Sequence, residues 1–278
     1  AWPAAKAVFD EVDAALGEKL SALIWEGDIA QLTLTQNAQP ALMATSMAAV
    51  RALEAEGMSV ESHVDFVAGH SLGEYSALCA AGSLSLSDTA RLLRIRGLAM
   101  QEAVPVGVGA MAALLGLDFE TAVSVAAEAA EGEVCQAAND NDPAQVVVSG
   151  HKAAVERAVE IARARGARRA LILPVSAPFH CALMQPAAHK MAEALSAVVI
   201  SKPSVPVVVN VRAEAVTEPD RIFDLLVAQV TGAVRWRESV LWMERAGVTE
   251  FWEIGAGQAL RRERSPGHSS PSRRRRRR

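Results

Sequence analysis

The stretch at residues 65–82 reads DFVAGHSLGEYSALCAAG and changes character at a serine. Residues 67–68 are typical of the end of a buried strand, and residues 72–81 are small and mostly apolar, as in a packed helix. Between them GHSLG, residues 69–73, has the spacing G-x-S-x-G. A serine in this spacing between a strand and a helix predicts a nucleophile elbow with Ser71 at its tip.

The chemistry explains the spacing. A sharp strand-to-helix turn strains the serine backbone, and we expect Gly69 and Gly73 to remove side chains that would clash there. The serine hydroxyl then projects over a helix N-terminus, whose free N–H groups can hold an oxyanion. The same five-residue pattern also arises in Gly/Ser-rich loops, so the hypothesis depends on partners elsewhere in the chain.

Length and composition bound the class of protein. The chain has 278 residues and is 51% hydrophobic, which predicts one large domain with an insertion, or two domains. It has no run of eighteen uncharged apolar residues and no basic segment followed by an apolar one at its start. We therefore expect no membrane span and a cytoplasmic enzyme.

The cysteines and the charge distribution exclude further kinds of site. Cys79, Cys135 and Cys181 form no C-x-x-C pair, which argues against a disulfide framework, a zinc site or another metal site. The net charge of −4 combines an arginine-rich end, residues 261–278, with a body that carries 19 basic and 31 acidic residues. That end favours a disordered tail over a nucleic-acid-binding segment, because it has no apolar periodicity.

The middle of the chain, residues 106–177, alternates short apolar runs with two helical patterns. The predicted order is β-α-β-β-α-β, which is the ferredoxin-like order. We expect a small ferredoxin-like subdomain inserted into a larger one.

The larger subdomain is predicted to combine residues 1–105 and 178–260. Helical patterns at residues 3–16, 40–57 and 85–104 alternate with apolar runs that include residues 205–211 and 249–255. This alternation predicts an α/β layer with a largely parallel sheet. Ser87 or Asp88 is the expected N-cap of the third helix.

A serine hydroxyl needs a base at neutral pH, and His180 is the best candidate among the six histidines. It lies in LPVSAPFHCALM, a proline-containing loop between a predicted strand and a helix, where catalytic residues often occur. Arg96 in LLRIRGLAMQ is either a solvated surface arginine or a bidentate clamp for a substrate carboxylate.

Several segments together resemble one family, the malonyl-CoA:acyl carrier protein transacylases of bacterial type II fatty acid synthesis. The segments are GHSLGEYSALCAAG, RIRGLAMQEAVPVGVGAMAALLGL, NDNDPAQVVVSGHKAAVERA, LPVSAPFHCALMQPAA and EIGAGQAL. The resemblance runs in order from Ala1 to about Leu260 and implies an α/β-hydrolase-like large subdomain with an inserted ferredoxin-like small one.

The resemblance implies a role for each matching residue. Ser71 becomes the nucleophile, His180 the base and Arg96 the partner of the malonyl carboxylate. Gln229 matches the glutamine whose main-chain carbonyl orients the histidine, although Ala233 replaces the family's usual proline nearby.

Two further positions match residues around the acyl group. The resemblance implies that Leu72 gives its backbone N–H to the oxyanion hole, and that Phe179 narrows the pocket toward malonyl and against branched groups. It also implies a strand and a G-Q-G-S-Q loop ahead of residue 1. We therefore expect the chain as given to lack one oxyanion donor and to be slower by about 10²- to 10³-fold.

The implied reaction moves a malonyl group from coenzyme A to the phosphopantetheine thiol of acyl carrier protein through a malonyl-serine. Malonyl-CoA and acyl carrier protein are the expected partners of a monomer that needs no cofactor, metal, nucleic acid or membrane. Three alternatives stay open: a serine esterase or thioesterase, the acyltransferase domain of a polyketide synthase, and a non-catalytic module that binds a carrier protein.

Overall fold

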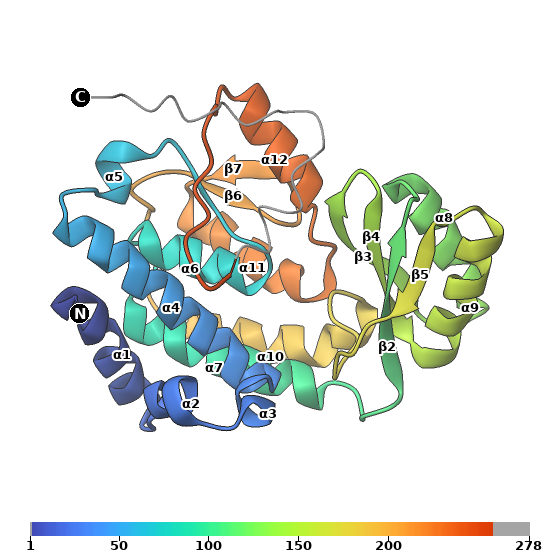
Figure 1. Cartoon of the computed structure of the whole chain (residues 1–278), viewed down its shortest axis with the longest axis horizontal. Coiled ribbons are helices and arrows are strands. Elements are labelled where there is room, and N and C mark those ends of the chain that lie inside the picture. The colour runs from blue at the N-terminus through green and yellow to red at the C-terminus, as the bar shows by residue number, and fades with distance from the viewer. Residues whose placement is uncertain (1, 258–278) are drawn as a thin grey trace, which may run out of the picture.

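The computed structural model describes residues 2–257, which fold into a mixed α/β structure around two separate sheets. A small three-stranded sheet lies among most of the helices, and a four-stranded sheet with two helices forms the other end of the molecule (Figure 1). The arginine-rich end for which a disordered tail was predicted lies outside the described residues.

The helices of the larger part come from both ends of the chain, as expected. They are α1 Pro3–Leu16, α2 Leu20–Glu26, α3 Ile29–Leu32, α4 Thr35–Ala55, α5 Val60–His63, α6 Leu72–Ala80, α7 Leu86–Glu102, the 3₁₀ turn η1 Ala182–Met184, α10 Gln185–Ser196, α11 Pro219–Thr231 and α12 Trp236–Arg245. The sequence prediction of α1 is confirmed at both ends. The short helices α2, α3 and α5 were not predicted, since each is too short to display a helical period.

Helix α4 begins at Thr35, five residues before the proline that was expected to start it. A proline inside a helix has no N–H for the carbonyl four residues earlier, here that of Gln36. The Nη1 atom of Arg94 in α7 donates to this carbonyl at 2.8 Å. A neighbouring helix therefore satisfies the acceptor that Pro40 leaves free, and α4 continues through the proline.

Helix α7 begins two or three residues earlier than the predicted caps imply. Ser85 is its N-cap, and the Ser85 hydroxyl oxygen accepts the N–H of Asp88 at 3.0 Å. Ser87, one of the predicted caps, instead donates to Glu11 in α1. Both serines have the right chemistry, but only Ser85 caps the helix, while Ser87 contacts α1.

The three-stranded sheet is smaller and less parallel than predicted. Strand β6, Val207–Val209, lies between β1, Val67–Ala68, and β7, Glu214–Val216. It pairs parallel with β1 and antiparallel with β7, a short strand that the sequence analysis missed. The expectation of a largely parallel sheet is therefore wrong for the described part of the chain.

The strand predicted at residues 249–255 does not form in the described structure, where this segment has no strand. Its alternating apolar residues fit an extended backbone, but a ladder also needs a neighbouring strand with a free edge. Sequence periodicity does not reveal whether such an edge is within reach.

The four-stranded sheet confirms the predicted β-α-β-β-α-β order for its elements. The elements are β2 Gly109–Leu115, α8 Phe119–Ala130, β3 Cys135–Asp142, β4 Gln145–His151, α9 Lys152–Ala164 and β5 Arg169–Ile172. The strand order is β3-β4-β2-β5, and all neighbouring strands are antiparallel. Alternate residues of the strands form an apolar core with α8 and α9, which is separate from the core of the larger part.

Polar contacts join the four-stranded unit to the segment between α11 and α12. Asn139 in β3 bridges to Val234, and the Asp140 N–H donates to the Val234 carbonyl at 2.9 Å. Arg237 of α12 reaches the buried carboxylate of Asp140 through Nε, 3.0 Å from each oxygen. These contacts fix one side of the small unit against the larger part.

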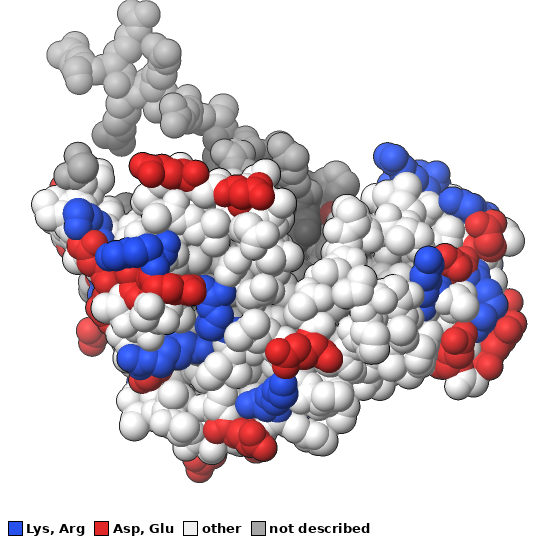
Figure 2. Space-filling view, turned by 90° about the horizontal axis from the view of Figure 1, so that it is seen from below, with Lys and Arg blue, Asp and Glu red and all other residues white. Residues whose placement is uncertain are grey.

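Figure 2 shows that charged side chains gather toward the two ends of one face, while much of its middle is uncharged. The charges over α8 and α9 are largely exposed ion pairs, such as Arg163 with Glu160. Such pairs contribute little to stability. Within residues 2–257, no helix is long and apolar enough to cross a membrane.

Candidate active site

The turn between β1 and α6 has the strained backbone that the elbow hypothesis predicts. Ser71 has φ 53° and ψ −110°, a positive φ that non-glycine residues rarely adopt. A Cβ built at Gly69 would lie 2.0 Å from the carbonyl carbon and oxygen of Gly73. Gly69 is therefore required by a backbone contact across the turn.

The expectation for Gly73 is wrong in one respect. A Cβ at Gly73 would meet no neighbouring atom within 4 Å, so this glycine does not relieve a clash of its own side chain. Its backbone is what Gly69 must accommodate. The two glycines of the motif thus differ in role.

Asn210, directly after β6, ties the elbow on both sides of the serine. Its Oδ1 accepts the Ser71 N–H at 2.7 Å, and its Nδ2 donates to the Gly69 carbonyl at 2.8 Å. The side chain is fully buried. The sequence analysis missed Asn210, because a single asparagine after a strand carries no local signal and its partner lies 139 positions away.

Ser71 and His180 meet as predicted. The Ser71 Oγ is 2.8 Å from the His180 Nε2, and the His180 Nδ1 is 2.9 Å from the main-chain carbonyl of Gln229. A carbonyl only accepts hydrogen bonds, so Nδ1 carries the proton and Nε2 is free to accept the serine proton. His180 itself has φ 58°, a second strained position in the site.

Burial keeps the His180 imidazole neutral. Desolvation, followed by the positive charge of Arg96, lowers the pKa of His180 to about 3, against the effect of its bond to Gln229. A neutral imidazole is the form that can take a proton from serine. The environment therefore holds the candidate base in its working state.

Arg96 is buried, which excludes the solvated-surface interpretation. Only 1% of it is exposed, and its Nη2 donates to the Ser71 Oγ at 3.0 Å. The guanidinium is also held by Gln39 through Nη1, at 2.7 Å, and by the Gln229 Oε1 at 2.9 Å. Its partners are neutral, and within residues 2–257 it forms no ion pair and its Nε has no acceptor. The guanidinium therefore remains available to an anion.

Two more polar residues of the site were not found from the sequence. Gln39 of α4 is buried and positions Arg96, and Glu74 of α6 is buried one turn after the serine. The Glu74 Oε2 accepts the Asn210 N–H at 2.8 Å and the Gln229 Nε2 at 3.0 Å. From the sequence alone, Glu74 is an ordinary acidic residue in the first turn of a helix, where a carboxylate stabilises the helix dipole. That pattern gives no sign of a role in the site.

Leu72 and Phe179 lie next to the reacting groups. Leu72 is the first residue of α6, and in the described structure its N–H has no hydrogen-bond acceptor. Phe179 precedes His180 and packs against both the main core and the small cluster around Met111 in β2. Phe179 therefore lies where the two parts of the molecule meet.

The other candidate groups lie away from the serine hydroxyl. His70 points to the four-stranded unit, where its Nε2 is 2.9 Å from the Asn141 Oδ1. All three cysteines are buried and free, and burial raises the pKa of Cys79 and Cys135 to about 11. Within the described residues no cluster of three metal-ligating side chains occurs.

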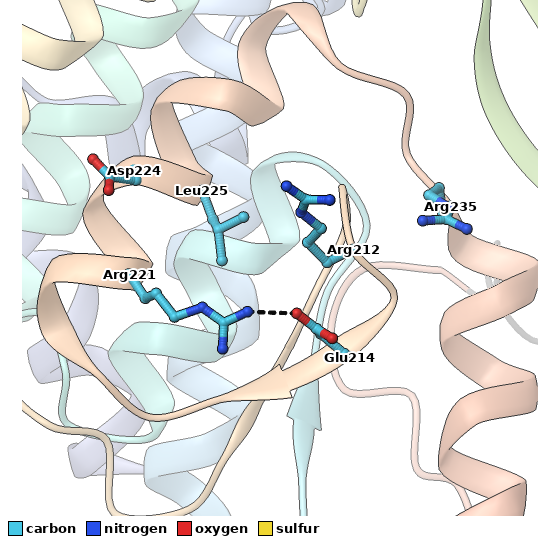
Figure 3. Close-up of a pocket in the computed structure, with 6 residues that line it drawn as sticks. All are labelled: Arg212, Glu214, Arg221, Asp224, Leu225 and Arg235. Carbon is cyan, nitrogen blue, oxygen red and sulfur yellow. Dashed lines mark hydrogen bonds and ion pairs between the residues drawn. The ribbon is translucent and has the colours of Figure 1, made fainter.

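A pocket of about 480 Å³ lies beside β7 and α11, and its lining does not include the reacting groups. Figure 3 shows its lining: Arg212, Glu214, Arg221, Asp224, Leu225 and Arg235. It borders the site through Asn210, whose carbonyl accepts the Arg235 N–H at 3.0 Å. Arg221 is paired with Glu214 across the pocket, so the lining mixes both signs of charge.

Comparisons with known proteins agree with this geometry. The family model described as the acyl transferase domain matches residues 1–261. The malonyl CoA-acyl carrier protein transacylase of Bacillus subtilis is 50% identical over 259 residues, which cover 93% of this chain and 80% of that protein. The protein of the same name from Escherichia coli K12 is 47% identical, with 93% and 83% covered.

Solved structures give the same result. The acyl-carrier-protein S-malonyltransferase of Bartonella henselae superimposes with a TM-score of 0.92 at 58% identity, covering 94% of this chain and 83% of that one. A malonyl-transacylase solved in complex with its type II polyketide acyl-carrier protein gives a TM-score of 0.90 at 42% identity, with 93% and 83% covered. With the strained serine, the buried histidine and the family model in agreement, the chain belongs to the acyl transferase domain family.

Proposed function

We propose that this protein transfers a malonyl group from coenzyme A to the phosphopantetheine thiol of acyl carrier protein. The observation that carries the proposal is the position of the Ser71 Oγ, between the His180 Nε2 at 2.8 Å and the Arg96 Nη2 at 3.0 Å. The relatives from B. subtilis and E. coli bear the name of this activity.

The proposed reaction has two halves. His180 takes the proton of Ser71 as the serine attacks the malonyl thioester; coenzyme A leaves, protonated by His180, and a malonyl-serine ester remains. His180 then takes the proton of the carrier-protein thiol, which attacks that ester, and Ser71 recovers its proton from His180. The main-chain carbonyl of Gln229 supports these proton transfers by keeping the His180 Nδ1 protonated, so that Nε2 can accept a proton.

Arg96 is proposed to bind the malonyl carboxylate. Its guanidinium is buried, held only by neutral groups within the described part, and next to the serine oxygen. A planar fork of N–H donors suits a carboxylate, and burial strengthens the interaction. Acyl groups without a carboxylate would offer the buried guanidinium no anionic ligand.

Two further roles complete the proposed site. Leu72 supplies a backbone N–H to the oxyanion, supported by its unpaired position at the start of α6. Phe179 limits the width of the acyl pocket, supported by its place between the main core and the small cluster around Met111.

We also propose a division of the chain that explains where the site lies. Residues 1–105 and 178–260 would form an α/β-hydrolase-like subdomain, and residues 106–177 a ferredoxin-like one. The strand order β3-β4-β2-β5 and the two separate apolar cores support this division. Monomeric state, cytoplasmic location, and independence from cofactor, metal and nucleic acid stay predictions.

The orientation of the histidine argues against the esterase alternative. Ser-His hydrolases of this elbow type place a carboxylate behind the histidine, whereas His180 contacts a main-chain carbonyl. A polyketide role has one observation in its favour, because one structural neighbour was solved in complex with a type II polyketide acyl-carrier protein. The carrier protein accepted, and not the chemistry, separates these pathways.

The direct test measures where the malonyl group goes. We expect purified protein to move label from malonyl-CoA to the carrier protein of fatty acid synthesis faster than to water, and Ser71→Ala to do neither. Faster transfer to a polyketide carrier protein would favour that pathway. Release of free malonate without transfer would contradict the proposal and favour a thioesterase.

A further inference from the structure

Glu74 is a buried carboxyl group in the site, and removing such a group from water costs free energy. It is 1% exposed, and among residues 2–257 it makes no ion pair; its Oε2 accepts N–H bonds from Asn210 at 2.8 Å and Gln229 at 3.0 Å. Burial raises the pKa of Glu74 to about 7, while these two bonds and the charge of Arg96 lower it. A carboxyl group kept in such a place needs a compensating role.

Glu74 and the Ser71 carbonyl together fix which way the Gln229 amide faces. The Nε2 atom of Gln229 donates to the Glu74 Oε2 and to the Ser71 carbonyl at 3.0 Å. Both partners present acceptor atoms, so the nitrogen must face them and the oxygen must face the other way. That oxygen accepts from the Arg96 Nη2, a group that only donates.

The chain of contacts therefore runs from Glu74 through Gln229 to the guanidinium. Arg96 has one anchor on each terminal nitrogen, Gln39 on Nη1 and Gln229 on Nη2. If the amide turned over, Arg96 would face a donor and lose one anchor. His180 would be unaffected, because its partner is the main-chain carbonyl of Gln229.

We infer that Glu74 is a positioning residue: it fixes Arg96 through the side chain of Gln229 and thereby sets the preference for acyl groups that carry a carboxylate. The inference rests on the proposed function, in which Arg96 binds the malonyl carboxylate. It assigns to Glu74 an effect on donor selectivity, whereas a purely structural carboxylate would affect all donors alike.

The test compares malonyl-CoA with acetyl-CoA as donors to the same carrier protein. In Glu74→Gln, charge-assisted bonds become neutral ones, and we expect the ratio of kcat/KM for malonyl over acetyl to fall roughly fivefold. The fall should come from a higher KM for malonyl-CoA. Glu102→Gln, which breaks an exposed ion pair with Lys190, is the matched control and should leave the ratio unchanged.

A second variant and a double variant test whether Glu74 acts on Arg96 through Gln229. Gln229→Met removes the amide that Glu74 orients, so the ratio of kcat/KM for malonyl over acetyl should fall again. In an Arg96→Ala background, Glu74→Gln should produce no further change in the ratio, because the group it positions is gone.

Two results would overturn the inference, and they differ from failure of the proposed function. Equal loss with both donors in Glu74→Gln and Gln229→Met would reduce Glu74 to a structural role, as would an unchanged ratio. Thermal unfolding of each variant accompanies the assay. If the parent protein takes no malonyl group at all, the proposed function fails and the inference falls with it.

Discussion

At the scale of single residues, the site depends on what each polar atom is able to donate or accept. The Gln229 carbonyl fixes the His180 tautomer, and the hydrogen-bond partners of Arg96 are neutral groups. The Ser71 Oγ lies between the His180 imidazole and the Arg96 guanidinium. It can therefore lose its proton to His180 and be stabilised as an anion by Arg96.

His180 should stay neutral where an ordinary histidine becomes charged. Its pKa is lowered to about 3 from 6.5, first by burial and then by Arg96. The unfolded chain binds this proton near pH 6.5 and the folded chain does not, so His180 makes folding less favourable as pH falls from 6.5 toward 3. We expect the ring resonances of His180 to keep neutral-imidazole shifts from pH 8 to 5 by NMR. A titration centred near 6.5 would contradict the burial argument.

Replacing Arg96 by alanine should change which acyl group is preferred. Loss of hydrogen bonds from a charged group lowers the preference for malonyl-CoA over acetyl-CoA by roughly 10- to 100-fold in kcat/KM. Steady-state rates with both donors, measured on folded variant protein, supply the comparison. An unchanged preference would remove Arg96 from carboxylate binding.

At the scale of elements, the elbow illustrates how a motif constrains a backbone. Gly69 approaches the backbone of Gly73 too closely for any side chain, while Gly73 faces open space at the start of α6. Both glycines look equivalent in the sequence. Only the direction of each missing Cβ distinguishes them.

The two glycines should therefore respond differently to alanine. Gly69→Ala forces the turn apart and should lower the free energy of unfolding by roughly 3 kcal/mol. Gly73→Ala relieves the entropic cost of a helical glycine and should be neutral or stabilising by about 0.5 kcal/mol. Urea denaturation of both variants provides the check, and equal destabilisation would show that the backbone contact does not matter.

Local patterns predicted most elements, because a helix such as α1 or the elbow at Ser71 records its own periodicity and turn chemistry. Contacts between distant segments were not predictable. Asn210 and Gln39 became part of the site only through folding. Likewise, Arg94 of a neighbouring helix donates to the carbonyl that Pro40 leaves without a partner. The strand predicted at residues 249–255 was wrong for the same reason, since pairing depends on a partner outside the segment.

At the scale of the whole molecule, the four-stranded unit is joined to the larger part beside the site. Asn141 of β3 contacts His70, the neighbour of the serine, while Asp140 is paired with Arg237 of α12. Phe179 packs against the main core and against the small cluster around Met111 of β2. The site is therefore sensitive to how these parts sit together.

Arg237 should matter more than its neighbour Arg235. Removing Arg237 leaves the fully buried Asp140 carboxylate without its cation, so Arg237→Ala should lower the free energy of unfolding by roughly 3 kcal/mol. Arg235 pairs with Glu238 in a more exposed setting, and Arg235→Ala should cost less than about 1 kcal/mol. Chemical denaturation separates them; similar losses would mean that the Asp140 contact does not hold the unit.

The central claim is that Ser71 carries the acyl group, and intact-protein mass spectrometry after mixing with malonyl-CoA tests it most directly. The account predicts a mass increase of one malonyl group, located at Ser71 by peptide mapping and absent from Ser71→Ala. Malonyl found on another residue, or retained by Ser71→Ala, would contradict it.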